Sequence, residues 1–266
     1  MSKDSTGIII AIINNKGGTG KTTAAANIAH ALGLLKKKVL IIDTGSECNL
    51  TKIFASGFKP KKTLYEILDG SCTDVSNAIT MTEYENVKCI LNTEETSMLE
   101  YDLVKNKHEP FTVLKNIIEK YAKKNFDYTI IDCPPNFGYF IISVLMFADA
   151  VIIPCESGST KSIDGAQKAM KLIAMDRKSR GNNIQWAKIL LNKMDMRTIL
   201  ARATIQMAHS VAGEQNVLKT FIPINEIIKQ ADAVKKTAIR FSSGSAAGRA
   251  FKALGKEIHE SFLSEV

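Results

Sequence analysis

The sequence has no apolar stretch that approaches the roughly 20 residues needed to span a membrane. Its first apolar run, residues 8–13, is only about six residues long, and the residues before it are polar. This start does not match a secretory signal peptide. Hydrophobic residues make up 45% of the chain and charged residues 23%, which is ordinary for a soluble globular protein. We therefore expect a cytoplasmic protein.

Cysteine is scarce and widely spaced. The chain has five cysteines and no C-x-x-C pair. This spacing favours reduced thiols and excludes both a disulfide framework and a zinc site of the usual spacing.

Repeats, linkers and low-complexity segments are also lacking. A chain of 266 residues can bury a full core as one large domain. Few residues precede the first apolar run, so we expect no N-terminal helix-turn-helix domain. The prediction is one domain over residues 1–266.

Positive charge is in excess and unevenly distributed. The formal net charge is +8, yet residues 61–110 hold five lysines and arginines against ten acidic residues. In residues 161–210 the balance is ten against three. A basic C-terminal half indicates either a phosphate-rich partner, such as nucleic acid or an anionic membrane, or simply a solvated basic face.

The strongest motif is N-K-G-G-T-G-K-T-T at residues 15–23, which lies between the apolar run and an alanine-rich helical stretch. Strand, glycine loop and helix form the context of a phosphate-binding loop. Glycines let backbone N–H groups point at an anion, and the helix dipole adds positive potential. The predicted nucleotide-binding residues of the loop are Gly17, Gly18, Thr19, Gly20, Lys21, Thr22 and Thr23.

Two further strands end in aspartates. Residues 39–42 lead to Asp43, and residues 126–131 lead to Asp132. A strand-end carboxylate that faces a phosphate loop can hold Mg²⁺ directly or through water. We predict Thr22 and Asp132 as metal ligands, with Lys21 reaching the β- and γ-phosphates.

The loop carries an additional lysine, Lys16, and residues 132–135 read D-C-P-P. Together these motifs resemble the ParA/MinD family of partition and positioning ATPases. The resemblance covers nearly the full chain. It implies ATP and Mg²⁺ as ligands and a homodimer in which Lys16 contacts the partner's nucleotide. It also assigns catalytic roles to Lys16, Lys21 and Asp43.

Two positions depart from the family pattern. The family usually has D-x-D where this chain has Asp43-Thr44-Gly45, so the aspartate that orients the attacking water is missing. We therefore expect slow or absent hydrolysis unless Glu47 substitutes for it. Arginines that often bind DNA after the last strand are also missing. The predicted replacements, against a plain solvated face, are Lys229, Lys235, Lys236 and Arg240.

The base-binding residues are predicted near the ends of the last strands. Residues 192–195 read N-K-M-D, which is also the guanine-reading pattern of GTPases. The remaining motifs favour ATP, although GTP stays an alternative. Asn192 is the predicted base contact, and Pro223 the other wall of the pocket.

Alternating strands and helices predict an α/β fold with a mostly parallel twisted sheet and helices on both faces. We expect a loop over residues 51–62, a helix over 111–124, strands over 148–154 and 217–222, and a proline stop at Pro154. The closing amphipathic helix, residues 251–262, is expected to pack on the core.

The function expected from this resemblance is a ParA-like switch. ATP closes a dimer that binds DNA without sequence preference, and a ParB-like or adaptor protein resets it. The dimer is then nucleoid-associated. The alternatives are a MinD-like membrane-positioning ATPase and a regulator that binds nucleotide but hardly hydrolyses it.

Overall fold

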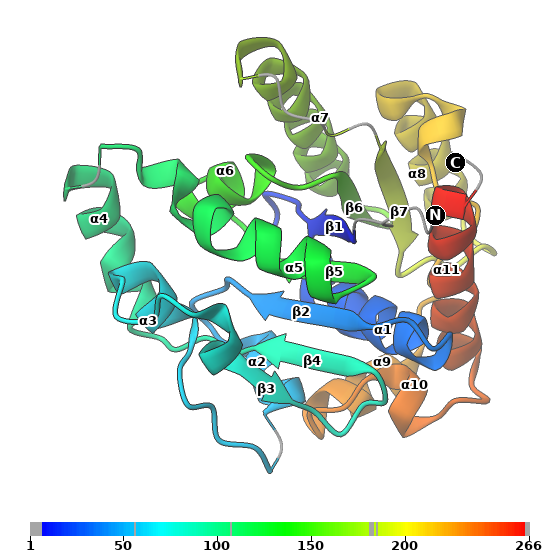
Figure 1. Cartoon of the computed structure of the whole chain (residues 1–266). Coiled ribbons are helices and arrows are strands. Elements are labelled where there is room, and N and C mark those ends of the chain that lie inside the picture. The colour runs from blue at the N-terminus through cyan, green and yellow to red at the C-terminus, as the bar shows by residue number, and fades with distance from the viewer. Residues whose placement is uncertain (1–6, 56, 107, 181–183, 185, 264–266) are drawn as a thin grey trace.

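The computed structural model describes residues 7–55, 57–106, 108–180, 184 and 186–263. Within them a seven-stranded sheet has the order β3-β4-β2-β5-β1-β6-β7 (Figure 1). All neighbours pair in parallel except β3 and β4. The strands are β1 (Ile8–Ile12), β2 (Val39–Asp43), β3 (Ile79–Met81), β4 (Val87–Ile90), β5 (Tyr128–Asp132), β6 (Ala150–Glu156) and β7 (Trp186–Asn192).

Helices connect these strands. They are α1 (Lys21–Leu34), α2 (Asn49–Phe54), α3 (Leu64–Asp69), α4 (Thr96–Asn106), α5 (Lys120–Asn125), α6 (Tyr139–Leu145), α7 (Thr160–Arg180), α8 (Ile199–Ala212), α9 (Glu226–Ala233), α10 (Ala238–Phe241) and α11 (Ala246–Leu263). Shorter turns are η1 (Val75–Ala78), η2 (Pro110–Thr112), η3 (Lys115–Glu119) and η4 (Glu214–Asn216).

Strand β1 shows why both faces of the sheet are covered. Successive side chains of a strand point to opposite faces. Ile9 and Ala11 therefore enter one core with α3, α6, α7 and α8, whereas Ile10 and Ile12 enter a second core with α1, α2, α10 and α11. The predicted fold class, a mostly parallel sheet between two helical layers, is confirmed.

Three sequence-based boundaries are wrong. Residues 51–54 of the expected loop belong to α2. The expected helix over 111–124 is helical throughout, although it begins as η2 and contains the π-helical turn η3 before α5. Residues 217–222 form isolated bridges and single hydrogen bonds with β7 and the residues just after it, not a strand. Strand β6 continues through Pro154 because β1 has already ended beside it, so no ladder bond needs the missing N–H.

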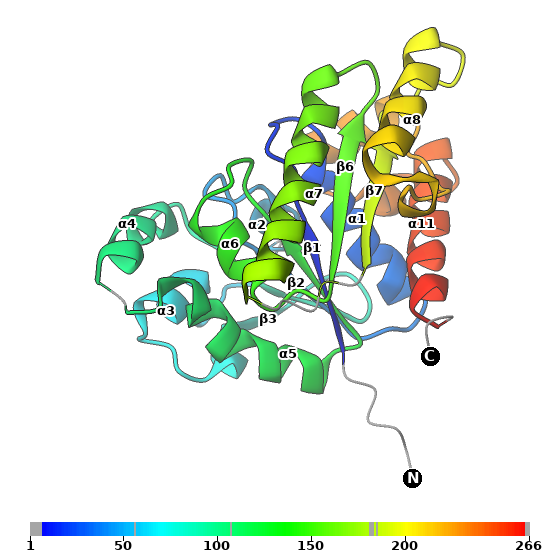
Figure 2. The same cartoon turned by 90° about the horizontal axis from the view of Figure 1, so that it is seen from above.

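Helix α11 packs closely on α1, and the two lie side by side (Figure 1, Figure 2). Phe251, Leu254 and Ile258 of α11 are buried, as expected for core packing. The closest approach is at Gly255, where an added Cβ would lie 2.5 Å from the Cβ of Ala31.

Replacing Gly255 with valine should lower the free energy of unfolding by about 1–3 kcal/mol, since the new side chain overpacks the α1–α11 contact. Urea denaturation measures this change. Gly244 has open space around its Cβ position, so Gly244→Val should stay within about 0.5 kcal/mol of the native protein. Equal effects of the two substitutions would contradict the packing argument.

Candidate functional site

The phosphate loop runs from the end of β1 to the start of α1, at the carboxyl edge of the sheet. Gly18 and Gly20 have φ of 80° and 87°, a left-handed conformation that favours glycine. A Cβ at Gly20 would lie 2.3 Å from Nδ2 of Asn192. The first N–H groups of α1 have no partner within the helix, and no side chain caps them. The predicted loop residues are therefore brought together in a shape suited to an anion.

Lys21 begins α1 and is buried, with 8% of its surface exposed. Its Nζ donates a hydrogen bond to the carbonyl oxygen of Lys16, 3.1 Å away across the loop. Burial lowers the pKa of Lys21, although the charge of Asp132 opposes this shift. The ammonium group is thus held beside the place where phosphates would lie.

Thr22 and Asp132 meet as predicted. The Thr22 hydroxyl donates to Oδ2 of Asp132 at 2.6 Å. The other carboxylate oxygen, Oδ1, is buried and has no hydrogen-bond partner. Burial, followed by the charge of Asp43, raises the pKa of the Asp132 carboxyl to about 8.

A magnesium ion fits these residues. A hydroxyl and an unpartnered carboxylate oxygen are the hard oxygen donors that Mg²⁺ prefers. No group of three or more His, Cys, Asp or Glu side chains among the described residues could form a metal cage. Mg²⁺ is usually held by one or two protein oxygens, with phosphate and water completing its shell. Thr22 and Asp132 would hold it here, and it would supply charge neutralisation to bound phosphates.

Asp43 lies beside Asp132, since the two residues are paired in the β2–β5 register. Its Oδ2 accepts bonds of 2.8 Å from both the backbone N–H and the hydroxyl of Thr51. Its Oδ1 accepts from the N–H of Gly45 at 2.9 Å. Burial raises the pKa of the Asp43 carboxyl. Asp43 therefore stabilises the turn after β2. The sequence analysis predicted a catalytic role for this residue and did not predict this structural one.

The position of Gly45 has room for a larger residue. A Cβ there would lie 3.4 Å from Oδ1 of Asp43, an ordinary contact, and the backbone is not left-handed. Glu47 is exposed, and its Oε2 accepts from Asn49 Nδ2 at 2.7 Å. The geometry that requires glycine at Gly20 does not require it at Gly45.

Asn192 and Pro223 lie at the end of β7 and in the segment beside it. The Asn192 side chain is buried, and its Nδ2 donates to the carbonyl oxygen of Thr19 at 2.7 Å. Met194 and Pro223 form an isolated parallel bridge. In this structure Asn192 braces the phosphate loop, and its contact with a base stays a prediction. The guanidinium of Arg197 donates hydrogen bonds to both carboxylate oxygens of Asp195. The carboxylate that would read guanine in the N-K-x-D pattern is therefore already paired.

Lys16 lies on the loop with its side chain 29% exposed. Its Nζ forms an ion pair of 3.0 Å with Glu156, the last residue of β6, and Lys193 Nζ lies 3.4 Å from the same carboxylate. The sequence analysis missed Glu156 because it ended this strand at Pro154. The strand-end carboxylate signal that located Asp43 and Asp132 applies to Glu156 only once β6 is known to continue through Pro154.

The four predicted DNA-binding residues are all exposed. Lys229 lies on α9 and pairs with Glu226 at 3.2 Å. Lys235 and Lys236 follow in the turn before α10. Arg240 lies on α10 with its guanidinium 3.7 Å from Glu83. They lie on one basic segment, residues 229–240, in which Ala231 and residues 237–239 are buried.

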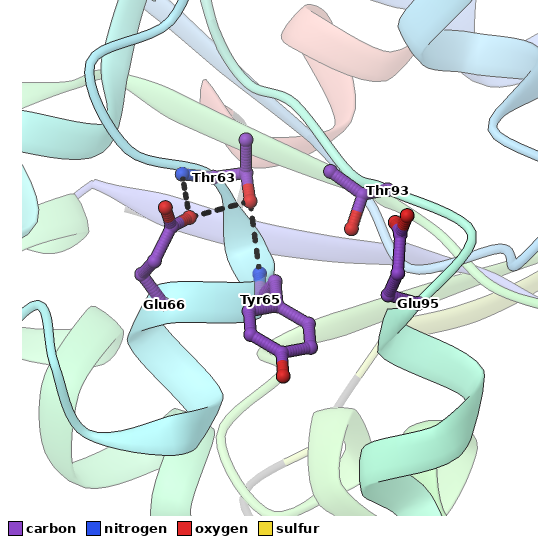
Figure 3. A pocket seen from close by; sticks show the side chains of 5 residues that line it. All are labelled: Thr63, Tyr65, Glu66, Thr93 and Glu95. Atoms are coloured by element: carbon purple, nitrogen blue, oxygen red, sulfur yellow. Dashed lines mark hydrogen bonds between the residues drawn. The ribbon is translucent and has the colours of Figure 1, made fainter.

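A cavity of about 190 Å³ lies apart from the phosphate loop, between α3 and the start of α4 (Figure 3). It is lined by Thr63, Tyr65, Glu66, Thr93 and Glu95. Glu66 accepts bonds from the N–H and hydroxyl of Thr63 at 2.7 Å each. These bonds form a capping box at the start of α3, and they give the Glu66 carboxylate a structural task.

Comparison with known sequences identifies the family. A family profile described as an AAA domain matches residues 7–186. The sporulation initiation inhibitor protein Soj of Bacillus subtilis is 31% identical over 257 residues, covering 95% of this chain and 98% of Soj. The chain belongs to the ParA/MinD family of P-loop ATPases. The chromosome partitioning protein ParA of Caulobacter vibrioides, another relative, is 26% identical over 94% of this chain and 93% of its own.

Solved structures share the family's fold. A variant of McdA from Cyanothece in complex with ATP has a TM-score of 0.82 at 22% identity, covering 96% of this chain and 97% of McdA. The septum site-determining protein MinD of Pyrococcus horikoshii, complexed with Mg-ADP, has a TM-score of 0.76 at 24% identity. That likeness covers 94% of this chain and 95% of MinD.

The buried carboxyl of Asp132 predicts a pH dependence of stability in the absence of Mg²⁺ and nucleotide. Between about pH 4 and pH 8 the folded chain keeps a proton on Asp132 that the unfolded chain has lost. Unfolding then releases a proton, so native stability falls as pH rises through this range. Asp132→Asn carries no such proton.

The free energy of unfolding of Asp132→Asn minus that of the native chain should therefore increase from pH 5 to pH 8. The expected slope is at most about 1.4 kcal/mol per pH unit, and the difference should level off above pH 8. Urea denaturation in a metal chelator measures both proteins. A difference that is constant across this range would contradict the raised pKa.

Proposed function

We propose that this protein is an ATP- and Mg²⁺-dependent partition switch. ATP binding at the phosphate loop closes a homodimer through Lys16, and the dimer binds duplex DNA without sequence preference. A partner protein of the ParB or adaptor type resets the switch. The protein acts in the cytoplasm and joins the nucleoid when ATP is bound. The single observation that carries the proposal is the additional lysine at the mouth of a complete phosphate loop.

The relatives support nucleotide and partition roles. One relative is the sporulation initiation inhibitor protein Soj, and another is the chromosome partitioning protein ParA. Two solved structures of the same fold are complexes with ATP and with Mg-ADP. The loop of this chain has the same elements: a buried lysine, a hydroxyl bonded to a strand-end aspartate, and glycines with positive φ.

The basic segment is bonded to the nucleotide-binding helix, which supports a link between ATP and DNA. Asn27 of α1 accepts a hydrogen bond from the N–H of Ile239 at 3.2 Å. His30 of α1 forms a 2.7 Å hydrogen bond with Thr237. Burial, with the charge of Arg240, lowers the pKa of His30 to about 4, so this histidine is neutral at physiological pH. These bonds offer a direct route by which a shift of α1 would reach Lys235, Lys236 and Arg240.

A membrane-positioning role has less support. The apolar face of α11 is buried against α1, with Phe251 and Leu254 at 1% and 0% exposure. That face is not available to lipid. Within the described ranges, no helix combines the length and apolar composition needed to cross a membrane.

One observation favours a second candidate, a regulator that binds ATP but hydrolyses it very slowly. Gly45 leaves the turn after β2 without a carboxylate to orient water, and Asp43 is already bonded to Thr51 and Gly45. Exposed Glu47 is the remaining nearby carboxylate on this turn. Turnover separates this candidate from a working ATPase.

Replacing both Lys235 and Lys236 with alanine should weaken binding of non-specific duplex DNA in the presence of ATP. Each lost phosphate contact should also reduce the slope of log affinity against log salt by about 0.9. Fluorescence anisotropy over a salt series measures both effects. Lys59→Ala/Lys61→Ala, which removes two exposed lysines of the segment between α2 and α3, is the matched control. Identical salt slopes for all three proteins would exclude the basic segment as the DNA surface.

Gly45→Asp should raise DNA-stimulated ATP turnover by on the order of 10- to 100-fold, because a carboxylate placed there can orient the attacking water. A Cβ at this position makes only an ordinary contact with Asp43, so nucleotide affinity should change little. Steady-state phosphate release measures the rate. Brisk turnover by the native protein would show that another group, with Glu47 the first candidate, positions the water.

A further inference from the structure

Glu156 forms a three-residue charge cluster at the mouth of the phosphate loop. Its Oε2 lies 3.0 Å from Lys16 Nζ, and its Oε1 lies 3.4 Å from Lys193 Nζ. The three side chains are 25%, 29% and 41% exposed for Glu156, Lys16 and Lys193. The Glu156 carboxylate thus pairs with Lys16 through one oxygen and with Lys193 through the other.

The fold positions this cluster from three elements. Glu156 ends β6 opposite Asn192, the last residue of β7. Lys193 follows with φ of 52°, a left-handed conformation that is unusual for a lysine. Its Nζ also donates to the carbonyl oxygen of Gly18 at 2.7 Å, so the side chain lies across the phosphate loop. An unusual backbone conformation at such a place suggests a functional role.

Hydrogen bonds also fix the backbone of Lys16, the cluster residue on the phosphate loop. The backbone N–H of Lys16 donates to Oδ1 of buried Asn14, whose Nδ2 donates to the carbonyl oxygens of Pro154 and Ser162. Burial acts to raise the pKa of the Glu156 carboxyl. The hydrogen bond from Lys16 and the charge of Lys193 outweigh burial and leave this pKa below its usual value. The carboxylate is therefore ionised when the loop holds no anion.

An incoming triphosphate brings negative charge to the same two ammonium groups. Lys16 cannot reach a partner's nucleotide while it is paired with its own Glu156. An interaction present only in the nucleotide-free state weakens binding by the free energy of that interaction. The geometry therefore sets Glu156 in competition with ATP.

We propose that Glu156 is a positioning residue that holds Lys16 and Lys193 within the nucleotide-free chain and so raises the ATP concentration needed for dimerisation. This inference rests on the proposed dimer, because it concerns the release of Lys16 to a second copy of the chain. Glu156 acts through the two lysines that it pairs with.

Glu156→Gln tests the inference, since it removes the charge and keeps the shape of the side chain. Partly exposed ion pairs are weak, so the ATP concentration at half-maximal dimerisation should fall by about three- to tenfold. Sedimentation velocity across an ATP series measures this midpoint. Glu119→Gln is the matched control, because it removes a 3.4 Å pair of similar exposure with Lys123 away from the loop. An unchanged or higher midpoint for Glu156→Gln would overturn the inference.

A second measurement does not depend on the dimer. Lysine acylation of the nucleotide-free chain, followed residue by residue with mass spectrometry, should be about three- to tenfold faster at Lys16 in Glu156→Gln, while Glu119→Gln leaves it unchanged. Equal rates at Lys16 in the native chain and in Glu156→Gln would refute the pairing itself. If the native chain forms no dimer at saturating ATP, the proposed function fails. In that case the ATP affinity of the monomer tests whether Glu156 competes with ATP for the two lysines. Tighter ATP binding by Glu156→Gln than by the native chain supports this competition, and equal or weaker binding contradicts it.

Discussion

The phosphate loop keeps its shape because hydrogen bonds from neighbouring strands hold it on several sides. Asn192 bonds to Thr19, Lys193 to Gly18, and Thr22 to Asp132. A glycine-rich segment has much conformational freedom to lose, and these bonds offset that loss before any ligand arrives. Binding of an anion can then use a prepared set of N–H groups. The order of the strands matters for this reason, since β5, β1, β6 and β7 end at the same edge.

Much of the fold and of the central site could be predicted from the sequence. The loop, the closing helix and the aspartates that end β2 and β5 follow from local patterns, since glycine spacing, apolar period and strand-end charge act over a few residues. Glu156 could not be placed, because β6 passes Pro154 only where β1 has ended, a fact of register between distant segments. Residues 217–222 were predicted as a strand from their apolar pattern. That pattern does not show how many hydrogen bonds the segment makes with the neighbouring strand.

The turn after β2 separates two tasks that a pair of aspartates is expected to share. Asp43 is bonded to Thr51 and Gly45, while Gly45 contributes backbone groups only. The turn is therefore stable without a side chain at Gly45. Glycine at this position therefore leaves the packing and the backbone hydrogen bonds of the turn intact.

The bonds of Asn27 and His30 to residues 237–239 have a consequence for how this protein can diverge. Helix α1 is about 20 Å long and stiff, so it joins two chemically unrelated surfaces as one body. The joint uses the Thr237 hydroxyl and one backbone N–H, and no lysine side chain takes part in these two hydrogen bonds. The outer surface can therefore exchange its lysines for other side chains during evolution and still keep its hydrogen bonds to α1.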